Sequence, residues 1–150
     1  MFAGTTRGGS TCDPEIIKYE FPSMNKVKSI SMDKIFNISC LSPDDKYLWV
    51  GCDDGIRVFN TETLELVHEE EMDTVYDLTI YKDAFMVIPC RDQSLVYFYS
   101  LRSYEDVTSM KVDNKVNTAV VNEKNGILVI GGGLDPKRVA NSRENNNTLT

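Results

Sequence analysis

The fold of this chain is decided by residues 35–59, which read I-F-N-I-S-C-L-S-P-D-D-K-Y-L-W-V-G-C-D-D-G-I-R-V-F. Three short runs rich in β-branched and aromatic residues are separated by two polar turns, and such runs favour strands. Pro43 presets the backbone for a type I turn, and Gly55 in the second turn tolerates a positive φ. The segment therefore predicts three antiparallel strands joined by tight turns.

This arrangement recurs along the chain. It starts at Ile35, restarts 40 residues later at Val75, and starts again 41 residues further on at Val116. We expect strands in the second unit at residues 75–81, 84–90 and 94–100, and in the third at 116–121 and 127–130. A weaker outer strand is expected around residues 64–67, and three more strands ahead of the first unit, at 2–4, 15–21 and 27–31. No window shows the apolar periodicity of a helix.

A period of about 40 to 45 residues with several short strands in each unit is typical of a β-propeller. Sheets of this kind cannot bury their apolar faces alone, so they stack around an axis, usually in rings of about four to eight. We predict an all-β fold made of about three blades of four-stranded antiparallel sheet. The prediction is a single partial propeller over residues 1–150, with approximate blades at 1–31, 32–72, 73–112 and 113–150. The chain is then either an excerpt of a longer propeller or one of two copies that share blades in a ring of about six.

Composition excludes several classes of function. A formal net charge of −7 disfavours a surface that neutralises phosphates, so we expect no direct contact with nucleic acid. The four cysteines, Cys12, Cys40, Cys52 and Cys90, form no C-x-x-C pair, so no metal site is expected. They are predicted to be buried thiols of a protein in the reducing cytoplasm. No stretch reaches the roughly 18 apolar residues of a membrane span.

Catalytic residues are not indicated. His68 is the only histidine and has no nucleophile beside it in the sequence, while the paired aspartates lie in turns. The triplet Gly131, Gly132 and Gly133 is followed by neither a helix nor the Gly-Lys-Ser/Thr of a phosphate-binding loop. These glycines are expected to give a sharp strand exit and close packing. We predict no enzymatic activity, no cofactor and no metal.

Residues 54–60, D-G-I-R-V-F-N, resemble the turn and third strand of a WD repeat, although Phe59 and Asn60 stand where that repeat has Trp-Asp. The resemblance implies a WD-repeat-type propeller. It also implies that Asp54 and Asp92 are structural turn residues that accept backbone N–H groups, with Gly55 supplying the turn geometry.

A narrower resemblance is to the i subunit of eukaryotic translation initiation factor three. The strand V-N-T-A-V-V at residues 116–121 and the glycine-ended strand at 127–133 carry it, together with the polar loop from 134 to 150. It implies a non-catalytic cytoplasmic scaffold that holds the b and g subunits and reaches the small ribosomal subunit indirectly. Partner contacts would then fall on Asp113, Asp135, Lys137 and Arg138. The rival hypothesis is an unrelated WD-repeat adaptor in a ubiquitin ligase or ciliary complex.

Overall fold

A computed structural model describes residues 1–4 and 13–133, and all of their regular structure is β-strand. The strands are β1 (Phe2–Gly4), β2 (Glu15–Tyr19), β3 (Lys26–Ser31), β4 (Phe36–Leu41), β5 (Tyr47–Cys52), β6 (Gly55–Asn60), β7 (Leu66–Glu71), β8 (Thr79–Tyr81), β9 (Phe85–Cys90), β10 (Leu95–Ser100), β11 (Asp106–Lys111), β12 (Val116–Asn122) and β13 (Ile127–Gly132). The prediction of an all-β fold is confirmed.

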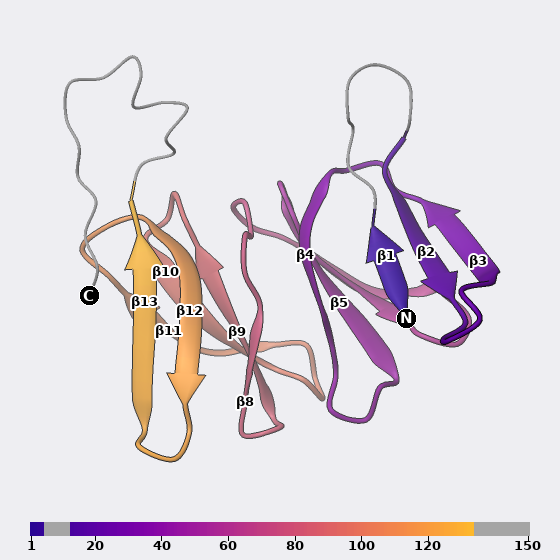
Figure 1. The fold of residues 1–150 in the computed structure, drawn as a ribbon. Coiled ribbons are helices and arrows are strands. Elements are labelled where there is room, and N and C mark those ends of the chain that lie inside the picture. Colours follow the sequence, from indigo (N-terminus) through magenta and orange to yellow (C-terminus); the bar gives the residue numbers. More distant parts are fainter. Residues whose placement is uncertain (5–12, 134–150) are drawn as a thin grey trace.

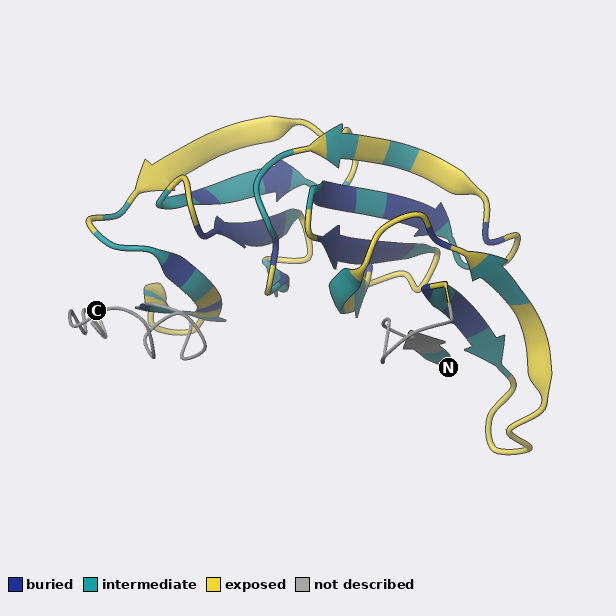
Figure 2. Ribbon diagram, turned by 90° about the horizontal axis from the view of Figure 1, so that it is seen from above, coloured by how far each residue is buried: buried dark blue, intermediate teal, exposed yellow. Residues whose placement is uncertain are grey.

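The strands form four antiparallel sheets in chain order, which we call blades A to D (Figure 1). Blade A holds β1 to β3, blade B holds β4 to β7, blade C holds β8 to β11, and blade D holds β12 and β13. Blades B and C are complete four-stranded sheets. Figure 2 shows the blades along an arc, with the exposed outer strands β3, β7 and β11 on its convex side. The molecule is thus a row of neighbouring sheets.

The hydrophobic core lies between successive blades. Trp49 and Val58 of blade B pack with Met86 and Ile88 of blade C, and all four are fully buried. Similar clusters fill the junction of blades A and B around Leu48, and that of blades C and D. Burial of such side chains is the main favourable term in folding. Because each cluster draws on two blades, a blade is stabilised mainly by its neighbours.

The turns that precede the outermost strands β3, β7 and β11 of blades A, B and C repeat closely. In each, the first residue donates its N–H to the carbonyl oxygen five residues later, at 2.9 Å in all three turns. The residue at the fifth position has a left-handed backbone, with φ of 60° at Met24, 57° at Leu64 and 60° at Tyr104. These three residues are spaced 40 apart. We call these segments, residues 20–25, 60–65 and 100–105, the outer turns.

Two of the predicted strands differ from the observed ones by four residues at one end, more than any other. The first strand of blade C was expected over 75–81 but spans only Thr79–Tyr81, with Val75 joined to Cys90 by an isolated bridge. The Asp77 carboxylate accepts the N–H of Leu78 at 2.9 Å, which competes with strand pairing there. The outer strand of blade B was expected over 64–67 but runs from Leu66 to Glu71. Leu64 belongs instead to the outer turn.

The placed cysteines are free thiols: Cys52 and Cys90 are buried and Cys40 is half-buried. Cys12 lies outside the described residues. Burial raises the pKa of all three thiols, and that of Cys90 reaches about 12. Within residues 1–4 and 13–133, there is no helix of the length and apolarity needed to span a bilayer.

Candidate partner-binding surface

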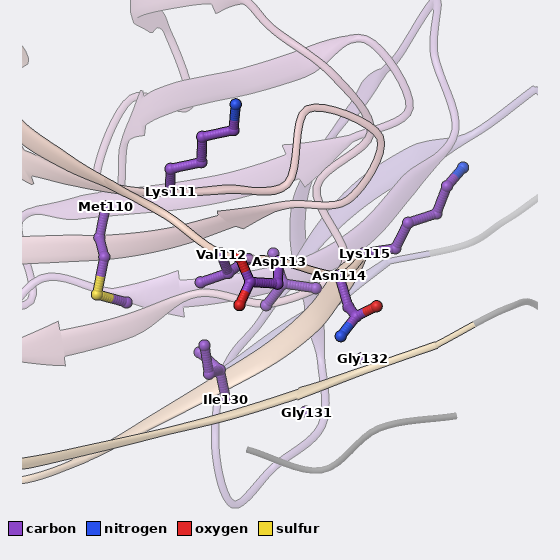
Figure 3. Close-up of a pocket in the computed structure, with 10 residues that line it drawn as sticks. Met110, Lys111, Val112, Asp113, Asn114, Lys115, Ile130, Gly131 and Gly132 are labelled. Atoms are coloured by element: carbon purple, nitrogen blue, oxygen red, sulfur yellow. The ribbon is translucent and has the colours of Figure 1, made fainter. Parts of the chain in front are cut away.

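The connection between β11 and β12 carries the one predicted partner-binding residue that the structure places. Asp113 is exposed there, beside a cleft of about 290 Å³ between this connection and the end of β13. Figure 3 shows Asp113 and Asn114 extending toward Ile130 and Gly131, whereas the ammonium groups of Lys111 and Lys115 point away from them. The cleft is lined by Met110, Lys111, Val112, Asp113, Asn114, Lys115, Val116, Ile130, Gly131 and Gly132. It offers apolar side chains beside a carboxylate and an amide.

The glycines at the end of β13 form one wall of this cleft. A Cβ on Gly132 would lie 1.7 Å from the carbonyl oxygen of Lys115, so only glycine fits. Gly133 has a φ of 144° and donates its N–H to the same oxygen at 3.1 Å. The strand end therefore packs directly against the backbone of the β11–β12 connection, and this contact holds the cleft wall in place.

Asp54 and Asp92 both lie in turns, where their carboxylates contact arginine or lysine side chains. Asp54 accepts two hydrogen bonds from the guanidinium of Arg57, at 2.9 and 3.3 Å, and lies 3.7 Å from the ammonium of Lys34. The bond from Arg57 holds the pKa of Asp54 below its usual value. Asp92 accepts a hydrogen bond at 2.7 Å from Lys115 of the neighbouring connection. Both aspartates thus join different segments.

In the turn that contains Asp92, the backbone N–H groups are bound by Asp73, a residue that the sequence did not lead us to predict. The Asp73 carboxylate accepts hydrogen bonds from the N–H groups of Asp92 and Gln93, the latter at 3.1 Å. The repeat could have indicated Asp73, because aspartates recur at the same place in each unit: Asp73 lies 40 residues from both Asp33 and Asp113.

A second missed set clamps neighbouring blades together. Asp77 of blade C accepts hydrogen bonds from the hydroxyl of Thr118 and, at 3.0 Å, from the N–H of Ala119, both in blade D. One period earlier, Asn37 of blade B donates to the carbonyl oxygen of Val75 in blade C at 3.2 Å. A polar residue at the same place in the repeat therefore reaches into the following blade in both cases.

The remaining predicted partner residues, Asp135, Lys137 and Arg138, lie outside the described residues. Among residues 1–4 and 13–133, no group of three or more His, Cys, Asp and Glu side chains could hold a metal ion. His68 serves packing between blades: its ring stacks on Tyr104 with centroids 5.1 Å apart, and its Nε2 lies 3.5 Å from a Glu70 carboxylate oxygen.

This arrangement is part of a β-propeller. The chain superposes on Kuenenia stuttgartiensis hydrazine synthase with a TM-score of 0.72 and 13% sequence identity, over 81% of this chain and 37% of that one. It also superposes on U3-55K, a WD40 protein, with a TM-score of 0.67 and 18% identity, over 79% of this chain and 39% of that one. No protein-family profile and no curated protein sequence matches the chain. These similarities show the fold, and the aligned part spans under two-fifths of either solved chain.

Proposed function

We propose that this chain is a non-catalytic scaffold that binds other polypeptides through loops at the ends of its blades. Loops on a rigid frame are the usual binding elements of repeat proteins. The frame here is held by buried clusters between the blades and by clamps such as Asp77.

The observation that carries the proposal is the cleft beside Asp113. Its walls combine apolar side chains, including Met110 and Ile130, with the exposed carboxylate of Asp113. A polypeptide segment with an apolar side chain next to a lysine or arginine would match both features. Its apolar side chain would lie against the apolar wall of the cleft, and its cationic group would pair with the Asp113 carboxylate.

The finer proposal is that the scaffold is a subunit of translation initiation factor three and holds its b and g subunits in the cytoplasm, with the small ribosomal subunit reached through them. Its support is the resemblance of residues 116–121 and 127–133, which form the hairpin β12–β13 that walls the cleft. The rival proposal, an unrelated WD-repeat adaptor, predicts a different set of bound proteins.

Affinity purification of the tagged full-length protein from a eukaryotic lysate tests both levels. The wild type should recover the b and g subunits, and Asp113→Lys should reduce that recovery at least about tenfold. Glu105→Lys, an exposed acid in the outer turn of blade C, is the matched control and should have no effect. Recovery of ligase or ciliary proteins without initiation-factor subunits would refute the finer proposal. If Asp113→Lys recovers as much of the b and g subunits as the wild type does, the cleft is not their binding site.

A further inference from the structure

In two places along the chain a glycine follows an aspartate or an asparagine, at Asp54–Gly55 and at Asn125–Gly126. The backbone nitrogen after such a residue can attack the γ-carbon of its side chain and close a five-membered imide ring. Glycine favours this reaction, because it has no Cβ to obstruct the attack and adopts conformations that other residues avoid. The sequence makes both sites candidates for this chemistry, and the fold distinguishes between them.

The Asp54–Gly55 peptide is held in place on both sides. Gly55 is buried at the start of β6, where it pairs with Cys52 of β5 and with Glu71 of β7. The guanidinium of Arg57 donates two hydrogen bonds to the Asp54 carboxylate and holds its pKa below the usual value, so the group stays ionised. An ionised carboxylate is a poor target for the attack, and it cannot turn toward Gly55 without losing both bonds. The fold therefore protects this site.

The Asn125–Gly126 peptide is open. It lies in the turn between β12 and β13, at the opposite end of β13 from Gly132 (Figure 1). Both residues are exposed, and a Cβ added to Gly126 would meet no atom within 4 Å. Within the described part of the chain, neither the Gly126 N–H nor the Asn125 side-chain amide makes a hydrogen bond. The attacking nitrogen and the amide that it would attack are thus both free to move.

The rest of this turn is anchored. Asn122 and Ile127 form the last pair of the hairpin, and the Glu123 carboxylate accepts the N–H of Lys82 in blade C. Asn122 is also exposed, but a glutamate follows it, and its Oδ1 accepts the N–H of Asn125 at 3.3 Å. Asn122 therefore serves as an internal comparison for Asn125 in the same turn.

We propose that Asn125 is a site of spontaneous deamidation in the folded protein, whereas Asp54 is protected from the corresponding isomerisation. The Gly126 nitrogen gives up its proton to base in the solvent and attacks Cγ of Asn125. The new C–N bond closes the imide as the Cγ–Nδ2 bond breaks, and the amide nitrogen takes a proton from solvent and leaves as ammonia. Water then adds to one of the two imide carbonyls and opens the ring, which leaves aspartate or isoaspartate at position 125. This inference does not depend on the proposed function.

The reaction changes the turn in two ways. Either product adds one negative charge, and isoaspartate also lengthens the backbone by one methylene, which disturbs the adjoining pair of Asn122 and Ile127 first. Gly126 lines a cleft of about 180 Å³ in which Tyr81 and Phe98 of blade C also take part. The new carboxylate would therefore lie beside an apolar cleft at the junction of blades C and D.

Peptide mapping by mass spectrometry tests the proposal on the purified 150-residue chain, kept folded in mildly alkaline buffer. Exchange of the amide NH2 for OH raises the mass of the peptide, and a protease that cleaves before aspartate but not before isoaspartate separates the two products. Asn125 should react at least about tenfold faster than Asn122, because only Asn125 precedes a glycine. Gly126→Ala is the matched control and should slow the reaction at Asn125 at least about tenfold.

A parallel incubation in urea separates the effect of the fold from that of the sequence. Asn125 should react at rates within about threefold in the folded and unfolded chains, whereas isomerisation of Asp54 should appear only in urea. An Asn125 that reacts in urea but stays intact in the folded chain overturns the proposal, because the turn would then protect it. A rate at Asn125 no higher than at Asn122, or unchanged by Gly126→Ala, also overturns it. Equal isomerisation of Asp54 in both states overturns the protection assigned to Arg57.

Discussion

Replacing Asp77 by alanine should uncouple blades C and D and weaken the fold as a whole. The Asp77 carboxylate accepts the Thr118 hydroxyl and the N–H of Ala119 across the junction, and the N–H of Leu78 within its own blade. Ala119 is only 2% exposed, so water cannot replace the lost acceptor for its N–H. Leaving a buried donor unpaired costs about 1 to 3 kcal/mol, and a hydrogen bond to a charged group contributes about 1.5 to 3 kcal/mol.

Because these two figures describe overlapping parts of the same interaction, we expect a total loss of about 3 kcal/mol from the free energy of unfolding. With a urea m-value of about 2 kcal/mol/M, the unfolding midpoint should fall by about 1.5 M. Asp77→Asn keeps an oxygen for Ala119 and should lose only about 1 kcal/mol. Asp113→Ala, an exposed acid, should change stability by less than about 0.5 kcal/mol.

Urea unfolding followed by tryptophan fluorescence measures these changes, since Trp49 is buried at the B–C junction. A double-mutant cycle with Thr118→Val isolates the contact between blades, and it should show a coupling of about 0.5 kcal/mol or more. A loss below about 1 kcal/mol for Asp77→Ala, or strict additivity with Thr118→Val, would refute the view that this carboxylate joins the blades.

Three further outcomes follow from the structure. Gly132→Ala should give no folded protein, as judged by circular dichroism, because the added Cβ would lie 1.7 Å from the Lys115 carbonyl oxygen. In the control Gly126→Ala the added Cβ meets no atom within 4 Å, so the free energy of unfolding should fall by only about 1 to 2 kcal/mol, owing to the left-handed backbone there. Tyr104→Ala should lower the free energy of unfolding by about 3 kcal/mol, because the ring contacts Tyr47, Trp49 and His68. Tyr104→Phe keeps the ring and should lower it by less than about 1 kcal/mol. Equal losses for the two variants would contradict the view that packing of the ring stabilises the junction between blades B and C. Burial raises the pKa of Cys90 to about 12, so the folded protein holds this thiol proton more tightly than the unfolded chain does. The free energy of unfolding should therefore fall as the pH rises from about 9 toward 12, and Cys90→Ala should make it depend less steeply on pH in urea titrations.

Local patterns were sufficient for much of the fold. Alternating β-branched residues, with Pro43 and Gly55 at the turns, predicted the antiparallel strands of blade B because strand preference and turn geometry depend on a few neighbouring residues. The spacing from Ile35 to Val75 to Val116 predicted the blades, since a repeated unit with an unburied face needs a neighbour. Where local chemistry competed, as at Asp77, the predicted strand was too long.

The sequence by itself determined the strands, the turns and the period, while the tertiary structure decided which side chains meet between blades. Met24 and Leu64 occupy equivalent positions in two outer turns, with φ of 60° and 57°, yet Met24 is exposed and Leu64 is buried. Likewise, no local feature distinguishes Asp77, which clamps two blades, from Asp113, which borders a cleft. Strand formation depends on adjacent residues, whereas burial and hydrogen-bond partners depend on segments some 40 residues away that only folding brings together.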